Sequence, residues 1–422
     1  MLNFATCSKE QLIKEKQLLE EKYNAYVGEN LKLDMSRGKP ASTQLDLNND
    51  ILSTLESYIS EDGTDARNYG VLDGLCEAKT LFSELLGIAK EKMIIGGNSS
   101  LNLMYDSMAR LYIFGTQGHT PWGKLDKVKF LCPSPGYDRH FSICEDLGID
   151  MIAVPMKSDG PDMDYVEELV KADASIKGIW CVPLYSNPQG ISYSDEVVDR
   201  LASMETAAPD FRIFWDNAYG VHHIYEEESL KDILKATEKA GNEDRVLYFF
   251  STSKITFPGA GVSLMASSLS NIQEIKKHMG AQTIGHDKLN QLRTVNYFKN
   301  AEGIRAHMKK LADELRPKFD IVLNTLEKEL GGSGLLSWTK PNGGYFVAVD
   351  TLPGCAKETV RLAKEAGVVL TDAGATYPYK KDPQDTNIRI APTYPTVEEL
   401  TKAIELFCVC VKLAGVNRLL DK

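Results

Sequence analysis

The chain has 422 residues, enough for two hydrophobic cores, and its 43% hydrophobic and 25% charged residues are ordinary for a globular protein. Its net charge of -11 disfavours nucleic acid and anionic lipid as partners, because both need a basic surface. We expect a cytoplasmic protein without a membrane span, since the first residues lack a signal-peptide pattern and no run of 18 apolar residues occurs.

The hydrophobic pattern predicts a helix over residues 12–27, followed by a turn at Gly38 and Pro40. From residue 93 to 266, short apolar runs alternate with helical patterns. Runs of this kind are typical of an α/β domain with a mostly parallel central sheet flanked by helices. The predicted strands are 93–95, 128–132, 151–156, 178–183, 211–215, 246–250 and 262–266.

A helical region is predicted from about residue 270 to 330, where a glycine-rich stretch ends it. A helix near 356–366, strands at 368–371 and 387–392 and a closing helix over about 396–415 follow, as in a smaller α+β domain.

We therefore expect an N-terminal segment (1–48) that packs with a small C-terminal α+β domain (301–422), and a large α/β domain (49–300) between them. In the closing helix, Cys408 and Cys410 are expected to be buried free thiols. No metal site is expected, because the eight cysteines lack paired CxxC spacing.

Polar residues follow the predicted strands, and ligands of parallel sheets bind at the carboxyl ends of strands. After the first strand, a helix is predicted to begin near Asn98, Ser99 and Ser100. Unpaired N–H groups and hydroxyls at the positive end of a helix suit a phosphate. Plain N-capping would also explain these residues.

Two loop residues follow the next strands. Tyr137 comes after a Pro-Gly turn, so its ring could lie over a planar ligand, although a packed loop tyrosine is the commoner case. Asn187 precedes Pro188, and its amide could donate to an oxygen, although turn formation alone would explain it.

Asp216 directly follows a run apolar enough to be buried, and a buried carboxylate needs a cationic partner or several donors. That partner could be a protonated ring nitrogen of a ligand, or a protein arginine or lysine. Tyr219, three residues later, could point its hydroxyl at the same ligand.

Ser251, Ser253 and Lys254 follow the strand at 246–250. A lysine in a partly desolvated pocket has a lowered pKa and a nucleophilic amine, as a Schiff base to a carbonyl requires. Together, the strand ends describe a planar cofactor with a phosphate, an acidic partner for its ring nitrogen and a lysine for its aldehyde. Pyridoxal phosphate fits that description.

These motifs also resemble a known family. The ordered set NSS at 98–100, PGY ending at Tyr137, SNP around Asn187, DNAY at 216–219, STSK at 251–254 and NIR ending at Arg389 is similar to the class I aminotransferases, fold type I pyridoxal-phosphate enzymes. The stretches LDMSRGKP, NYGVLDG and STSKITFPGAG are most similar to the bacterial aspartate aminotransferase subgroup. The resemblance runs from about residue 31 to 395.

The resemblance implies a role for each residue around the cofactor ring. Lys254 would hold the cofactor as a Schiff base and later carry a proton at the substrate α-carbon. Asp216 would pair with the ring nitrogen, Tyr219 and Asn187 would bond its phenolic oxygen, and Tyr137 would stack on the ring. Ser99, Ser100 and Ser251 would bind the phosphate, and Tyr69 would reach the phosphate of a neighbouring subunit, which implies a homodimer with shared sites. Asn98 and Ser253 are also expected to bind the cofactor.

On the substrate side, the resemblance assigns Arg389 to the α-carboxylate, because its planar fork matches a carboxylate. Asn187 would also contact the substrate. Gly38 would let the N-terminal segment close over it, with an ordinary turn as the alternative explanation.

The sequence departs from the family at the phosphate, because many members carry an arginine eight residues past the Schiff-base lysine, where this chain has Val262. A side-chain arginine for a second substrate carboxylate is also unassigned, and Arg37 and Arg139 are conceivable.

The expected function is transamination between an L-amino acid, with aspartate as the expected donor, and 2-oxoglutarate in two half-reactions. A lyase or decarboxylase on the same fold, such as a carbon-sulfur β-lyase or an aspartate β-decarboxylase, is the alternative. A non-enzymatic regulator is disfavoured, because such proteins carry a DNA-binding domain and only about 30 residues precede LDMSRGKP. A nucleotide-binding protein is disfavoured because no GxxxxGK or GxGxxG loop follows the first strand.

Overall fold

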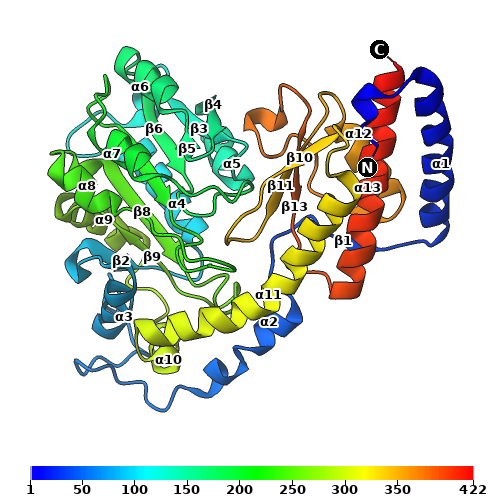
Figure 1. Ribbon diagram of the computed structural model, residues 1–422. Coiled ribbons are helices and arrows are strands. Elements are labelled where there is room, and N and C mark those ends of the chain that lie inside the picture. Colours follow the sequence, from blue (N-terminus) through cyan, green and yellow to red (C-terminus); the bar gives the residue numbers. More distant parts are fainter. Residues whose placement is uncertain (1, 422) are drawn as a thin grey trace.

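An eight-stranded sheet and a three-stranded sheet organise the computed structural model, which describes residues 2–421 (Figure 1). The larger sheet has the order β2-β9-β8-β7-β6-β3-β4-β5, and the five neighbouring strands from β8 to β4 run parallel. The seven predicted strands are all present, and the α/β fold with a mostly parallel sheet is confirmed. The strands are β2 (Met93–Ile95), β3 (Lys129–Ser134), β4 (Asp150–Lys157), β5 (Gly160–Pro161), β6 (Ile176–Cys181), β7 (Arg212–Asp216), β8 (Val246–Ser251) and β9 (Ser263–Ala266).

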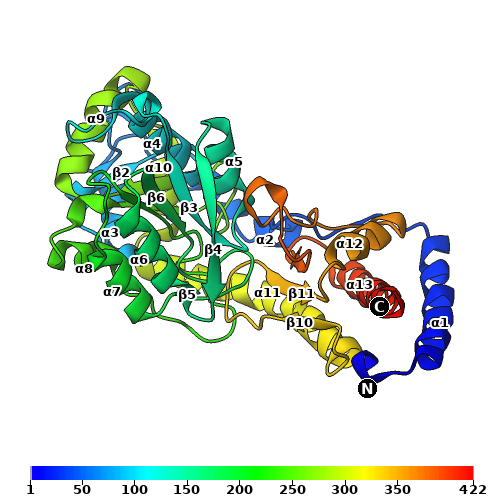
Figure 2. The ribbon, with the colours of Figure 1, turned by 90° about the horizontal axis from the view of Figure 1, so that it is seen from above.

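Helices cover both faces of this sheet, which explains why its central strands are apolar throughout (Figure 2). On one face lie α4 (Ser100–Phe114), α5 (Asp138–Asp146) and α9 (Leu269–Gln282). On the other lie α3 (Cys76–Leu86), α6 (Met163–Ala172), α7 (Asp195–Ser203), α8 (Ile233–Lys239) and α10 (Lys288–Phe298). Every residue of β6, β7 and β8 is buried.

The helical region predicted from about 270 to 330 consists of α9, α10 and the 30-residue α11 (Ala301–Leu330). Two side-chain caps divide it. Asp287 accepts the backbone N–H of Asn290 at the start of α10, and Asn300 accepts that of Gly303 at the start of α11. Helix α11 then runs from the larger sheet towards the smaller one (Figure 1).

The smaller sheet is antiparallel, in the order β10 (Leu336–Trp338), β11 (Val347–Thr351) and β13 (Asn387–Ile390). Beside it pack α12 (Ala356–Glu365) and α13 (Val397–Leu420), and α1 (Lys9–Gly28) packs on the outer side of α13. The N-terminal segment joins this part because β1 (Leu33–Asp34) pairs in parallel with β12 (Val368–Val369).

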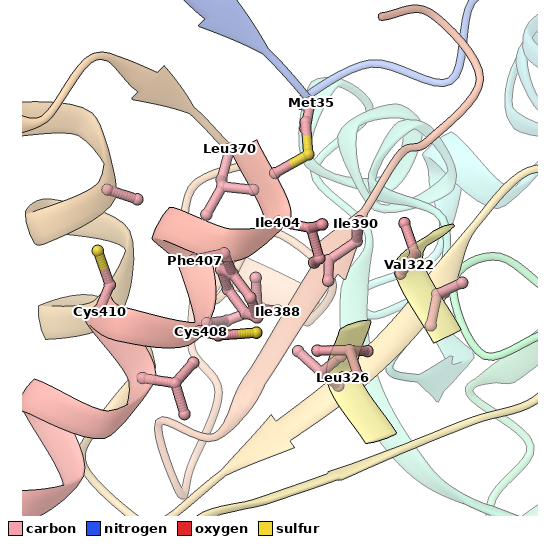
Figure 3. Close-up of a cluster of buried hydrophobic side chains, with 14 of the residues drawn as sticks. Met35, Val322, Leu326, Leu370, Ile388, Ile390, Ile404, Phe407, Cys408 and Cys410 are labelled. Carbon is pink, nitrogen blue, oxygen red and sulfur yellow. The ribbon is translucent and has the colours of Figure 1, made fainter. Parts of the chain in front are cut away.

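A second core lies between α13, α11 and this smaller sheet (Figure 3). Phe407 of α13, Ile388 of β13 and Val322 of α11 are all buried there. Cys408 and Cys410 are buried in the same helix, as predicted.

The remaining described elements are short. They are α2 (Ser42–Asp46) and the 3-10 turns η1 (Phe4–Thr6), η2 (Asn49–Ser53), η3 (Lys90–Lys92), η4 (Trp122–Lys124), η5 (Glu243–Arg245) and η6 (Pro378–Lys380). Among residues 2–421, no helix combines the length and apolar composition that a membrane crossing needs. The same residues contain no group of three or more His, Cys, Asp or Glu arranged to hold a metal ion.

Candidate active site

Two cavities share part of their lining where the parallel strands end. We name them after a residue that lines only one of them. The Asp216 cavity, of about 300 Å³, brings together most of the predicted cofactor residues. Its lining includes Gly38, Asn98, Ser99, Ser100, Tyr137, Asn187, Asp216, Tyr219, Ser251, Ser253 and Lys254. The Arg389 cavity, of about 580 Å³, shares Gly38, Tyr137, Asn187, Tyr219 and Lys254 and adds Arg389.

Asp216 is the last residue of β7, and only 2% of it is exposed. Its Oδ2 lies 3.0 Å from Nε2 of His140, whereas its Oδ1 is buried without a hydrogen-bond partner. Within residues 2–421, no lysine or arginine nitrogen lies within 4.0 Å of this carboxylate, so the arginine or lysine partner considered from sequence is not found. A buried carboxylate oxygen beside a cavity is thus available to a cationic N–H donor.

His140 orients Asp216, and sequence reasoning missed it. Its ring stacks on Trp180, with centroids 4.3 Å apart and planes inclined by 8°. The available signal was its position in α5, three residues after Tyr137, which places a histidine beside the strand ends.

Lys254 follows β8 and lines both cavities. Its Nζ lies 4.7 Å from the ring centroid of Tyr219 and 5.9 Å from that of Tyr345. Burial lowers the pKa of Lys254, and the charge of Arg389 lowers it further, while Asp216 opposes the change. The amine is therefore more readily deprotonated and more nucleophilic than a surface lysine.

The first turn of α4 opens onto the Asp216 cavity. Ser99 is the N-cap residue, but its side chain accepts no capping hydrogen bond, so the capping explanation does not hold for it. The Ser251 hydroxyl donates to Ser253 Oγ at 3.1 Å, and Ser253 Oγ donates to the Asn98 carbonyl at 3.2 Å. Free helix N–H groups and three nearby serines can hold a phosphate.

Arg389, in β13, is 7% exposed and reaches across to residues of the larger sheet. Its Nη1 donates to Asn187 Oδ1 at 3.2 Å and to Asp138 Oδ1 at 3.1 Å. Its Nη2 donates to Thr371 Oγ1 at 3.3 Å, and its Nε is buried without a partner. The guanidinium therefore keeps donor capacity for an anionic ligand.

Gly38 is needed for a close approach and not for a turn conformation. A Cβ at this position would lie 2.4 Å from Cζ of Phe346, and its φ is not in the left-handed region. Phe346 in turn lies under Arg389, with the guanidinium carbon 4.7 Å from its ring centroid. The N-terminal segment thus packs against the aromatic ring that contacts Arg389.

Tyr69 does not join the other predicted residues. It is 82% exposed and lines a separate surface cavity with Arg67, His286 and Lys288. A contact with a neighbouring subunit's phosphate, as the family resemblance implies, is compatible with this exposure but stays a prediction.

The phosphate arginine missing at position 262 has a candidate replacement. Val262 is 2% exposed and packs in the core, so it does not take that role. Among the described residues that line the Asp216 cavity, Lys39 is the cation besides Lys254. Its Nζ lies 3.8 Å from the ring centroid of Tyr394. Sequence reasoning missed Lys39, although it adjoins Gly38.

A second buried histidine lies behind Lys254. His222 is 2% exposed, contacts the rings of Tyr219 and Tyr345, and has no partner on either ring nitrogen. Burial, together with the charge of Lys254, lowers the pKa of His222 to about 3. The ring is therefore neutral at physiological pH and adds no positive charge beside the lysine.

Comparisons with known proteins agree with the site motifs and extend over nearly the whole chain. A model of the aspartate amino-transferase family matches residues 7–422. The aspartate aminotransferase of Corynebacterium glutamicum is 48% identical over 403 residues, which cover 94% of this chain and 93% of that protein. A crystal structure of an aspartate transaminase from the same species matches with a TM-score of 0.97 at 46% identity, covering 99% of both chains. LysN, an α-aminoadipate aminotransferase of Thermus thermophilus complexed with N-(5'-phosphopyridoxyl)-L-leucine, shares the fold with a TM-score of 0.75 at 21% identity, over 92% of this chain and 93% of that chain.

Proposed function

The chain belongs to the aspartate aminotransferase family of pyridoxal-phosphate-dependent enzymes, and on that premise we propose that it transfers the amino group of L-aspartate to 2-oxoglutarate. The observation that carries the proposal is the buried, unpartnered Oδ1 of Asp216 in the same cavity as the Lys254 amine. A buried carboxylate and an amine in one cavity fit the ring nitrogen and the aldehyde of one planar cofactor.

The residues present fit pyridoxal phosphate at each of its polar groups. Asp216 Oδ1 would accept from the ring nitrogen, the N-terminus of α4 with Ser99 and Ser251 would hold the phosphate, and Lys254 would bond the aldehyde carbon. When bound, this cofactor supplies an electron sink for the pair left on the substrate α-carbon.

The chain's own residues would do the remaining work. Lys254, once released from the aldehyde, is the base that removes the α-proton, and its lowered pKa leaves the amine free to accept it. Arg389 binds the α-carboxylate. Asn187, which lines both cavities, accepts a hydrogen bond from this arginine. Tyr137 covers the ring and helps to exclude water.

Specificity for dicarboxylic substrates is supported by the charges that line the Arg389 cavity. Besides Arg389, the side chains of Arg37, Arg139 and Lys380 line it. All three are exposed, so they can reorient towards a second carboxylate. We assign the β-carboxylate of aspartate and the γ-carboxylate of 2-oxoglutarate to this group.

We also propose a homodimer with shared sites, in which Tyr69 from one subunit completes the phosphate site of the other. Its 82% exposure supports this, because a tyrosine so placed leaves a large ring surface for a partner to cover. Location in the cytoplasm and the division of the chain after residues 48 and 300 stay predictions.

Covalent trapping tests the central assignment. The purified protein should be yellow, and borohydride reduction followed by peptide mapping should fix the cofactor to Lys254. Lys288→Ala is the control, because this lysine is buried but lies outside the Asp216 cavity. Trapping at another lysine, or none, would contradict the assignment.

The same preparation distinguishes the reaction classes. Transamination predicts that aspartate is consumed only when 2-oxoglutarate is present, with equal amounts of glutamate and oxaloacetate formed. Release of pyruvate, ammonia or carbon dioxide without a keto acid would favour a lyase or decarboxylase instead.

A further inference from the structure

Arg389 already has a carboxylate partner within the protein. Asp138, the first residue of α5, accepts from Arg389 Nη1 at 3.1 Å. The Arg389 side chain is 8% exposed and that of Asp138 33%. In the part of the chain that the structure describes, no other carboxylate lies within 4.0 Å of this guanidinium. Asp138 therefore supplies the countercharge that a buried guanidinium needs.

The other contacts position the guanidinium without neutralising it. Asn187 and Thr371 accept from it through uncharged oxygens, at 3.2 and 3.3 Å. Phe346 packs against its face, and Nε has no partner. A carboxylate ligand thus meets an arginine that is held in place, uses three of its five N–H donors within the protein, and carries one resident anion on Nη1.

The position of Asp138 in its helix does not account for this contact. A carboxylate in the first turn of α5 is favoured by the helix dipole whichever way it points. However, no side chain caps α5, whose N-cap residue is Tyr137. Asp138 instead points to a residue 251 positions away in the sequence, on the other sheet.

We propose that Asp138 is a positioning residue that neutralises Arg389 between turnovers and competes with the incoming α-carboxylate. The inference rests on the proposed function, since it requires that Arg389 bind a carboxylate. An anion that binds at Nη1 has to displace Asp138 or share that nitrogen with it, and an anion that binds the remaining donors meets a guanidinium whose charge Asp138 already balances. In both cases the resident carboxylate lowers substrate affinity and speeds product release. Removing its charge should therefore tighten binding.

The test measures binding of succinate, a dicarboxylate without an amine or a carbonyl, to the holoenzyme by titration calorimetry. Asp138→Asn keeps the side-chain shape and removes the charge, and it should lower the Kd of succinate at least threefold. Asp138→Ser removes the same charge with a different side chain and should act in the same direction. The KM values for the amino acid and the keto acid should fall together, because both carry the α-carboxylate.

Glu145→Gln is the matched control. Glu145 lies in the same helix and lines the same cavity, but it makes no ion pair with Arg389. Equal tightening by this variant would mean that the overall potential of the cavity is responsible, and would overturn the inference. Unchanged or weaker succinate binding in both Asp138 variants would overturn it as well.

Arg389→Lys separates this inference from the function on which it rests. If this variant binds succinate as well as the wild type does, Arg389 does not bind the substrate carboxylate. The proposed function is then left without a residue for that group. If it binds succinate more weakly while the Asp138 variants are unchanged, only the role of Asp138 is wrong.

Discussion

The Asp216 cavity and the Arg389 cavity share several walls but are built in different ways. Asp216, Ser251 and Lys254 come from or directly after two neighbouring parallel strands, β7 and β8, whose register places Asp216 opposite Phe249. The Arg389 cavity is lined by residues from 36–38, 137–145, 369–380 and 389, which come from the N-terminal segment, from α5 and the loop residue before it, and from the part of the chain around the smaller sheet.

Under the proposed function, this difference separates the side chains that perform the chemistry from those that bind the substrate. Side chains at adjacent strand ends move only with the sheet, so their mutual geometry is set when the sheet forms. Side chains of the Arg389 cavity depend on contacts between elements that are far apart in sequence, and several of the charged ones are exposed. We expect substitutions in the first cavity to affect mainly turnover and those in the second to affect mainly KM.

The largest effect should come from Asp216→Asn, which tests whether the Asp216 cavity is built for chemistry. Turnover should fall on the order of 100-fold or more, because a buried charge aimed at the reacting group is lost. The melting temperature of the cofactor-free protein should stay the same or rise, since Oδ1 has no partner there and burial of the charge is costly. Steady-state kinetics and thermal unfolding measure the two effects.

Asp210→Asn is the structural counterpart. Asp210 is also buried, but both oxygens are satisfied, by Lys177 Nζ at 2.6 Å and Trp122 Nε1 at 2.8 Å. Its replacement leaves a buried lysine without its countercharge and should lower the free energy of unfolding by about 3 kcal/mol while turnover of the folded protein is retained. Matching behaviour of the two variants would refute the claim that the buried carboxylate of Asp216 serves chemistry whereas that of Asp210 serves stability.

The contrast between the cavities also explains what the sequence could predict. Asp216 and Lys254 were identifiable because apolar runs locate parallel strands, and ligands bind at their carboxyl ends. The same rule placed Asn187 and the start of α4. These predictions need only the position of a residue relative to its own strand or helix.

Contacts between distant elements were not predictable in this way. Sequence patterns do not show which residue of β13 faces α5, so the pairing of Arg389 with Asp138 was not predicted. His140 beneath Asp216 and Phe346 against Gly38 were missed for the same reason. Tyr69 stays a prediction, because its expected partner lies on a second subunit.

A smaller effect is expected from Gly38→Ala, which tests whether the contact of the N-terminal segment with Phe346 keeps Arg389 in place. The new Cβ would lie 2.4 Å from Phe346 Cζ, so the ring must shift and Arg389 with it. The KM values for both substrates should rise between about tenfold and a hundredfold, with a smaller change in kcat, because misplacing a binding group weakens substrate orientation.

Two variants make this prediction specific. Gly28→Ala introduces the same methyl group where no atom lies within 4 Å, and it should leave KM unchanged. Phe346→Leu combined with Gly38→Ala makes room for the methyl group and should bring KM part of the way back. A double variant no better than Gly38→Ala alone would show that the ring does not transmit the effect.

The smallest effect concerns pH and tests how deeply His222, which contacts the rings of Tyr219 and Tyr345, is buried. His222 has a pKa of about 3 in the folded chain against an ordinary value of 6.5, mainly because of burial. Between these values the unfolded chain binds a proton at this site and the folded chain does not. The free energy of unfolding therefore falls as the pH falls through 6.5 towards 3.

His222→Phe removes this proton uptake and keeps an aromatic ring between Tyr219 and Tyr345. From pH 7 to pH 5, the wild type should lose about 2 kcal/mol more stability than this variant, at about 1.4 kcal/mol for each pH unit below 6.5. Urea unfolding at the two pH values measures the difference. His278→Phe, at a partly exposed ring stacked 4.1 Å from Phe114, controls for the effect on stability of replacing a histidine by a phenylalanine elsewhere in the chain. A wild-type slope in His222→Phe would mean that water reaches this histidine and that the side chains around Tyr219 and Tyr345 do not exclude it.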